Sequence, residues 1–289
     1  MTITSDMVCA VPRARRTLGA EAFGRAGEFV AARACPDGGF RGRSDASDLY
    51  YTSFALLASP AAPPATRDYV RAFADGADLD LVHLGCLARA RRLLHLPLDA
   101  LDAQLARRVL TYARDDGGFH TDPSAGCSSA YGCFIAIAAL QDLATPLPRP
   151  AEMADVLEAM RTPAGGFANT PGAPLATTPA TAAAVVALRE LGHAPAKEAL
   201  AWLLARRAAD GGFRAAPGLP APDLLATAVA LHALALSGAD LSDSRDPCLD
   251  YLNSLWDPSG GFRAHWADRE LDVEYAFYGL LAAGALSPQ

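Results

Sequence analysis

Apolar and polar positions divide the chain into helix-length segments of two alternating kinds. The first kind is amphipathic, and the second is more evenly apolar around the helix. Amphipathic segments occupy residues 22–35, 101–114, 152–161, 197–208 and 247–256, and apolar segments occupy 48–58, 79–95, 128–143, 179–191, 223–236 and 271–286. The pattern predicts helical hairpins, each of which pairs a half-exposed helix with a buried one.

A Gly-Gly-Phe turn joins the two helices of most hairpins. Glycine accepts a positive φ without steric cost, so the turn suits the end of a helix. A degenerate repeat fits into the long gap after the first turn, at Asp75-Gly76. The turns end at Phe40, Phe119, Phe167, Phe213 and Phe262, and the last four recur at intervals of 46 to 49 residues.

These repeats predict an all-α fold, an α/α toroid of about six helical hairpins. One hairpin cannot bury both of its faces, but six that close on themselves can. The apolar helices would line the inside, and each phenylalanine would pack between neighbouring hairpins. Residues 1–19 are expected to form a flexible N-terminal segment and residues 20–289 a single domain.

The composition restricts the kinds of partner that a protein of this fold could bind. With 51% apolar and 20% charged residues the chain can build a large core, and its net charge of −7 argues against binding nucleic acid. No apolar run is long enough to span a membrane or to serve as a signal peptide, so a cytoplasmic protein is expected. Six cysteines without a Cys-x-x-Cys pair indicate structural thiols and predict no metal site or other cofactor.

The turns and the flanking helices resemble the prenyltransferase and squalene-cyclase repeat family. That family comprises protein prenyltransferase β-subunits and the barrel domains of class II terpene cyclases. The resemblance spans nearly the whole chain and implies an α/α toroid whose central cavity holds an isoprenoid or similarly elongated apolar molecule. It implies an α-like subunit for a prenyltransferase, and it leaves a homodimer open.

Two segments resemble the zinc site of the prenyltransferase β-subunits. The family has Gly-Phe-x-Gly-Arg followed by Asp-x-Cys-Tyr-Ser, whose Asp and Cys bind zinc. A later Asp-x-x-His supplies the histidine that completes the zinc site. Here Asp48 keeps the carboxylate, but Tyr50 replaces the cysteine, and Tyr275 replaces the histidine after Asp272. One carboxylate cannot hold zinc alone, so zinc is disfavoured.

The family's diphosphate pocket is matched only in part. Arg43 and Tyr51 match its arginine and tyrosine, whereas Ala46 replaces a lysine and Ser128 a histidine. Because charge-assisted contacts provide most of the binding, the loss of two cations should weaken diphosphate binding.

The cyclase branch protonates an alkene with the central acid of an Asp-x-Asp-Asp motif. Asp78 and Asp80 match the first two acidic positions, and Leu81 occupies the third. The match implies that Asp80 is the proton donor, and His83, three residues later on the same helical face, would orient or recharge it. The alternative is ordinary helix capping, which also applies to Asp48 and Asp272.

Aromatic residues gather near the starts of the apolar helices. They either fill the core or line an apolar cavity, where their faces would stabilise a carbocation. The candidates are Tyr50, Tyr51, Tyr131, Phe134, Tyr275, Phe277 and Tyr278.

The sequence therefore favours metal-independent, terpene-cyclase-like chemistry on an elongated apolar substrate. Two alternatives remain open. One is a divergent, zinc-less prenyltransferase-like protein that uses a prenyl diphosphate, and the other is a non-catalytic apolar-ligand-binding or scaffold protein.

Overall fold

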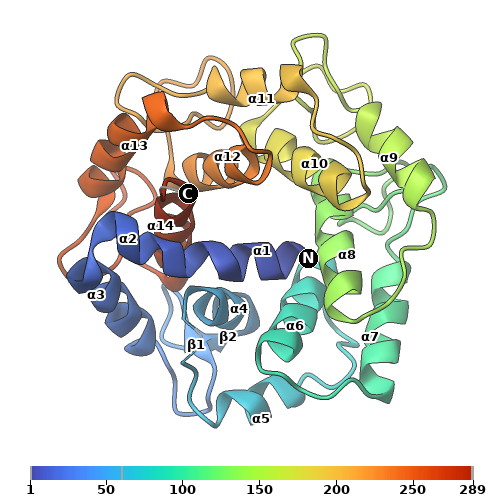
Figure 1. Cartoon of the computed structure of the whole chain (residues 1–289). Helices are drawn as coiled ribbons and strands as arrows, with labels where there is room; N and C mark the ends of the chain where they lie inside the picture. The colour runs from blue at the N-terminus through green and yellow to red at the C-terminus, as the bar shows by residue number, and fades with distance from the viewer. Residues whose placement is uncertain (1, 60, 288–289) are drawn as a thin grey trace. The chain divides into compact units, whose positions relative to one another are not determined.

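The computed structural model describes residues 2–59 and 61–287, and its helices alternate much as the sequence predicts (Figure 1). Backbone contacts divide the chain into two compact units. The first unit contains the chain up to Thr4, Phe73–Arg206 and Ala215–Leu219, and the second contains Ser5–Ala72, Arg207–Arg214 and the chain from Pro220 on. Within the described residues, no helix combines the length and the apolar character needed to cross a membrane.

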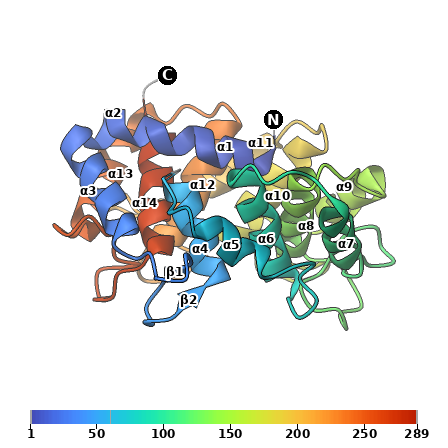
Figure 2. The same cartoon turned by 90° about the horizontal axis from the view of Figure 1, so that it is seen from below.

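Three apolar helices form the centre of the first unit: α6 (Leu81–Leu93), α8 (Ala130–Asp142) and α10 (Thr178–Glu190). They pack in this order, side by side (Figures 1 and 2). The amphipathic helices α7 (Ala100–Leu110), α9 (Pro150–Glu158) and α11 (Lys197–Leu204) pack against them. In α10 nearly every side chain is buried, as expected of a helix that is apolar all round.

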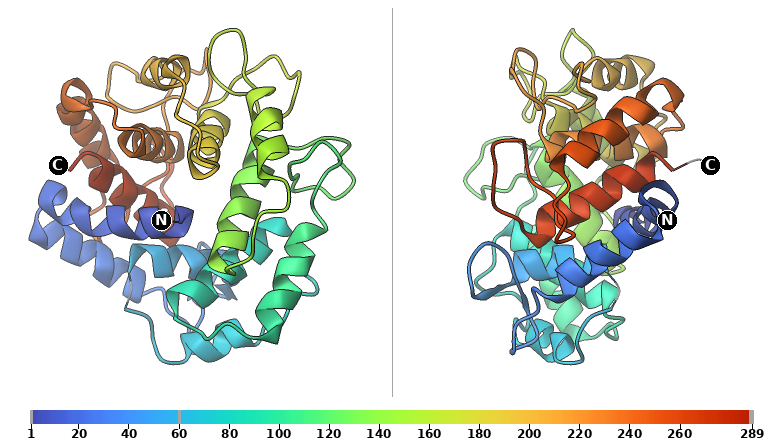
Figure 3. Two further views of the ribbon diagram at one scale, coloured as in Figure 1. Left: turned by 45° about the vertical axis from the view of Figure 1, so that its right-hand side comes forward. Right: turned by 90° about the vertical axis from the view of Figure 1, so that its left-hand side faces the viewer.

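The second unit repeats this arrangement with α4 (Leu49–Ala58), α12 (Leu224–Leu236) and α14 (Val273–Ala285). Helix α14, red in Figure 3, packs against both α4 and α12. The accompanying helices are α3 (Ala20–Ala31), α5 (Thr66–Arg71) and α13 (Ser242–Leu255). A short antiparallel pair, β1 (Phe40–Arg41) and β2 (Ser47–Asp48), leads from the first turn into α4, with Phe40 opposite Asp48.

The N-terminal residues, expected to be flexible, carry three short helices. These are α1 (Ile3–Ala10), the 3-10 helix η1 (Val11–Arg13) and α2 (Ala14–Leu18), and both η1 and α2 pack on α14. In the first unit, the Thr4 hydroxyl donates a hydrogen bond of 2.7 Å to Asp142. The boundary predicted at residue 19 stays a prediction.

The Gly-Gly-Phe turns have one structure throughout. Each phenylalanine is at most 2% exposed, which confirms that it packs in the core. In four turns its N–H is satisfied by a side chain of the helix that follows: the hydroxyls of Thr52, Thr181 and Thr227 and the Cys133 Sγ accept from Phe40, Phe167, Phe213 and Phe119.

The first glycine of each turn has a positive φ between 92° and 103°. A Cβ at Gly211 would overlap the Pro247 carbonyl in α13, and one at Gly260 would overlap the Arg25 carbonyl in α3. A Cβ would also overlap the Ala65 backbone at Gly38 and the Glu152 Cβ at Gly117, and at Gly165 it would lie 3.0 Å from the Glu198 carbonyl oxygen. These glycines therefore let each turn rest directly on the backbone of another hairpin's helix.

We expect Gly211→Ala to be much more destabilising than Gly218→Ala. Gly218 also has a positive φ, of 81°, but nothing lies within 4 Å of its potential Cβ, so only the backbone cost of about 1–2 kcal/mol applies there. At Gly211 the overlap adds an overpacking cost, for a total of about 2–5 kcal/mol. Urea unfolding followed by circular dichroism at 222 nm measures the free energy of unfolding of both variants. Equal decreases in this free energy would contradict the steric explanation.

Candidate functional site

The N-terminus of α14 organises the candidate site. Asp272 is the N-cap, and its Oδ1 accepts a hydrogen bond of 3.0 Å from the Tyr275 amide, as an aspartate at this position commonly does. Its Oδ2 accepts a second bond, of 2.7 Å, from Arg43 Nε. The Asp272 side chain is only 1% exposed, so Arg43 balances a carboxylate that is otherwise out of reach of water.

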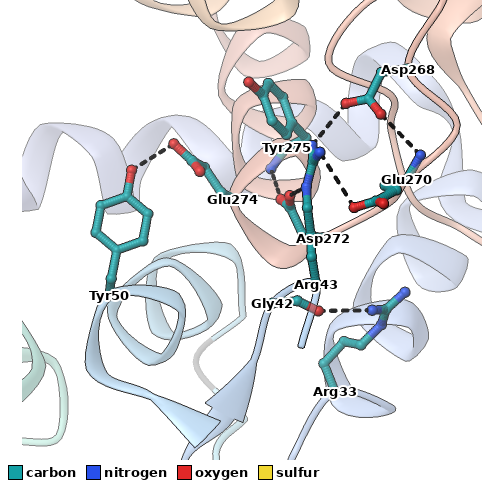
Figure 4. Close-up of polar contacts among 9 residues, drawn as sticks. All are labelled: Arg33, Gly42, Arg43, Tyr50, Asp268, Glu270, Asp272, Glu274 and Tyr275. Carbon is teal, nitrogen blue, oxygen red and sulfur yellow. Dashed lines mark hydrogen bonds and ion pairs between the residues drawn. The ribbon is translucent and has the colours of Figure 1, made fainter. Parts of the chain in front are cut away.

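Arg43 holds three carboxylates at once (Figure 4). Besides Asp272, its Nη2 donates to Asp268 Oδ2 at 2.8 Å, and its Nη1 lies 3.5 Å from Glu270 Oε2. The hydrogen bond to Asp272 is the largest of the effects that raise the pKa of Arg43. The guanidinium carbon also lies 5.7 Å from the centre of the Tyr275 ring. Each nitrogen of this arginine therefore already faces a carboxylate.

Glu274, the second residue of α14, lies in a different environment from Asp272. Its Oε1 accepts a hydrogen bond of 2.7 Å from the Tyr50 hydroxyl of α4 (Figure 4). Burial raises the pKa of Glu274, and the nearby Asp272 adds to this. Together they outweigh the opposing effects of the Tyr50 bond and Arg43. The result is a carboxyl group whose neutral form is favoured relative to an ordinary glutamate.

Aromatic rings adjoin this Tyr50–Glu274 pair. The Tyr50 ring lies 4.8 Å from that of Phe54, which in turn lies 5.4 Å from Phe277 and 5.6 Å from Tyr278. Burial, followed by the charges of Glu274 and Asp272, raises the pKa of Tyr275 to about 12, so its phenol stays neutral at physiological pH. The site thus combines one carboxyl group of raised pKa with rings from α4 and α14.

The residues at the family's zinc positions do not fit a zinc ion. Asp48 caps α4, where its Oδ1 accepts from the Tyr50 and Tyr51 amides at 2.7 and 3.2 Å. The Tyr50 hydroxyl is bonded to Glu274, and the Tyr275 phenol is neutral. Zinc takes thiolate, imidazole and carboxylate ligands, of which these three positions offer one. Among residues 2–59 and 61–287, no group of three or more His, Cys, Asp or Glu is placed to hold a metal.

Asp80 and His83 are in contact at the start of α6. Asp80 is the N-cap, and its Oδ1 lies 2.9 Å from the His83 amide and 2.8 Å from His83 Nδ1. The Asp80 side chain is 58% exposed. Burial tends to raise the pKa of Asp80, but the hydrogen bonds from the His83 amide and ring lower it overall. This environment favours the ionised carboxylate, whereas a proton donor must be neutral.

The other predicted residues are distributed over the two units. Asp78 is exposed just before α6. On α8, Tyr131 is 41% exposed, its amide donates to Asn169, and Phe134 is half-buried. Tyr51 packs its ring directly over Gly42 in the second unit, where a Cβ would overlap it.

Sequence reasoning assigned no role to Glu274, Asp268, Glu270 or Phe54. One signal was present for the first of these, since Glu274 is the only charged residue between Val273 and Ala285. A lone acid in an otherwise uncharged, apolar helix is expensive to bury and so suggests a specific partner. Asp268 and Glu270 lie in an ordinary polar loop, which gives no such signal.

Comparison with known proteins supports the fold. A protein-family model described as the prenyltransferase alpha-alpha toroid domain matches residues 115–199 and 182–287. A variant of the type II terpene cyclase MstE from Scytonema, in complex with geranylgeranyl dihydroxybenzoate, has a TM-score of 0.68 at 15% identity over 96% of this chain and 97% of its own. Protein geranylgeranyltransferase-I from Candida albicans, complexed with GGPP, has a TM-score of 0.68 at 13% identity over 91% and 90%.

A more distant similarity is that to ent-copalyl diphosphate synthase from Streptomyces platensis. It has a TM-score of 0.53 at 22% identity, over 92% of this chain and 50% of its own. No curated protein matches the sequence. The matches confirm the α/α-toroid fold class and the family resemblance predicted from the Gly-Gly-Phe repeats.

The opposite pKa shifts of Glu274 and Asp80 predict opposite effects of pH on stability. The raised pKa of Glu274 gives a stabilising contribution that is complete below its ordinary value of 4.5 and is lost as pH rises above it. The lowered pKa of Asp80 gives a contribution that is present above 3.8 and is lost as pH falls below it. Glu274→Gln should therefore gain stability relative to the wild type from pH 4 to pH 8.

Asp80→Asn serves as the matched control, because the stability of this variant relative to the wild type should be lowest near pH 7 and should recover toward pH 3. Urea titrations at each pH measure the free energy of unfolding of the two variants and of the wild type. Parallel trends in the two variants would contradict the assigned environments.

Proposed function

Because the chain belongs to the prenyltransferase α/α-toroid domain family, we propose that it is an isoprenoid-processing enzyme with terpene-cyclase-like chemistry. Its substrate would be an elongated apolar molecule. Type II terpene cyclase MstE, of the same fold, has been seen with geranylgeranyl dihydroxybenzoate and with the product merosterolic acid A, which supports a substrate of this kind.

The Tyr50–Glu274 pair carries the proposal. Cyclisation that starts by protonation requires an acid that is neutral before it reacts, and burial raises the pKa of Glu274 in that direction. Tyr50 donates to Glu274 Oε1, which leaves Oε2 to carry the proton. The rings of Tyr50, Phe54 and Tyr278 lie within 6 Å of one another in series and present faces that stabilise a cation.

The proposed reaction balances without a metal or another co-reactant. Glu274 gives its proton to one carbon of an alkene and becomes a carboxylate, and the other carbon becomes a tertiary carbocation. A second double bond of the substrate attacks this cation and closes a ring. Loss of a proton from the final cation forms a new double bond, and Glu274 is reprotonated from solvent through the Tyr50 hydroxyl.

Asp80, assisted by Asp78 and His83, stays the competing proposal for the acid. Its resemblance to the cyclase motif favours it, but its exposure and lowered pKa do not. The zinc-less prenyltransferase alternative would need Arg43 for a diphosphate, and that side chain is bonded to Asp268 and Asp272. The scaffold alternative predicts no turnover at all.

The test is turnover of geranylgeraniol, geranylgeranyl diphosphate and geranylgeranyl dihydroxybenzoate in D₂O, with product analysis by mass spectrometry. Protonation-initiated cyclisation gives an isomer that carries one deuteron from solvent, whereas ionisation of a diphosphate carries none and releases pyrophosphate. Glu274→Gln should lower turnover by about 10²–10⁴-fold, the usual contribution of a general acid.

Glu158→Gln, on the exposed side of α9, is the control and should retain wild-type turnover. Loss of turnover in Asp80→Asn with retention in Glu274→Gln would assign the acid to Asp80 and reject Glu274. Absence of any product from all three substrates would reject the proposed activity.

A further inference from the structure

We propose that the site selects isoprenoids whose head group is an alcohol or phenol, because an acidic loop occupies the arginine that a phosphorylated head group would need. This inference rests on the proposed function and names its substrate class. The loop is residues 265–272, and its specificity-determining residues are Asp268 and Glu270.

Arg43 has little capacity left for an anion. Its Nε, Nη2 and Nη1 face Asp272, Asp268 and Glu270 at 2.7, 2.8 and 3.5 Å. A phosphate that displaced these carboxylates would leave Asp272, 1% exposed, and Asp268, 14% exposed, without their cation. An unpaired buried carboxylate is strongly destabilising, so the exchange is unfavourable.

The acidic loop is held in place by its own backbone. The Asp268 amide donates to the His265 carbonyl at 3.0 Å, and Asp268 Oδ1 accepts from the Glu270 amide at 3.0 Å. Asp268 therefore uses one oxygen to shape the loop and the other to bind Arg43. The contact with Arg43 is thus part of a folded turn, since both partners are fixed before any ligand arrives.

Charge at the site also disfavours phosphate. Three carboxylates, those of Asp268, Glu270 and Asp272, face the guanidinium of Arg43. A prenyl diphosphate would bring several further negative charges to this surplus, and juxtaposed like charges select against a ligand. A hydroxyl group fits instead, because it can donate a hydrogen bond to the 65% exposed Glu270.

A nearby cavity must be controlled for in any binding experiment. It has a volume of about 550 Å³, and Glu28, Arg33, Arg41, Arg43 and Asp45 are among its lining residues. Because Arg33 and Arg41 both line it, an anion added at high concentration would meet two further cations there. Arg43 lines this cavity as well, so the control variant must change charges of the cavity while leaving the acidic loop intact.

The experiment is a titration of geranylgeraniol and geranylgeranyl diphosphate against the wild-type protein, followed by native mass spectrometry. Cyclisation does not change a ligand's mass, so occupancy is read whether or not turnover occurs. We expect the alcohol to bind at least about tenfold more tightly than the diphosphate. In Asp268→Asn/Glu270→Gln, diphosphate affinity should rise by about tenfold or more, and a further Arg43→Gln should abolish the gain.

The matched control is Glu28→Gln/Asp45→Asn, which removes the same charge from the neighbouring cavity without touching an Arg43 contact. An equal gain in this variant would show an effect of net charge only and would overturn the proposal. Tighter binding of the diphosphate than of the alcohol by the wild type would also overturn it, as would binding of neither ligand. A preference for the alcohol without any product would support the head-group inference while rejecting the proposed activity.

Discussion

The structure depends on the absence of a side chain at the first glycine of each Gly-Gly-Phe turn. At this position the chain combines a positive φ with direct contact between the turn and the backbone of another hairpin's helix. Only glycine meets both conditions. The contact sets how closely two hairpins approach. The phenylalanine two residues later is buried, and in four of the turns its N–H is bonded to a side chain of the next helix. The start of that next helix carries Tyr50 in α4 and Asp272 and Glu274 in α14.

Asp80 and Glu274 both lie at the start of a helix, but their pKa values shift in opposite directions. An N-cap aspartate accepts backbone N–H groups, and those bonds favour its ionised form. Asp80 follows this rule. Glu274 is in the first turn of α14, where Asp272 is the cap that accepts the amide hydrogen bond, and burial dominates the pKa of Glu274. Asp223 shows that burial can win even at a cap, because its pKa is raised despite a bond from the Ala226 amide. Burial, more than position in the helix, therefore accounts for the raised pKa values of Glu274 and Asp223.

The sequence predicted the hairpins well because helix period and turn chemistry are local. The apolar segment 223–236 became α12 at Leu224–Leu236, and 128–143 became α8 at Ala130–Asp142. Helix α5 was missed since it has only six residues, and α1 to α2 were missed since small residues and arginines obscure the apolar period there. The contact of Asp80 with His83 also followed from local spacing. The pairs Tyr50–Glu274 and Arg43–Asp268 did not, because more than 200 residues separate their members and no local rule connects them.

Arg43 is held by carboxylates that are distant from it in the sequence. Arg43 lies between β1 and β2, and the pairing of these two strands fixes its position after the Gly-Gly-Phe turn. In this chain Asp268 and Asp272 supply the negative charge that it requires, from a loop at the opposite end of the sequence. A guanidinium pairs with a carboxylate or a phosphate, and the two compete for the same N–H donors. The carboxylates of Asp268 and Asp272 thus satisfy Arg43 from within the protein, and the bond to Asp272 joins the start of α14 to the segment that follows the first turn.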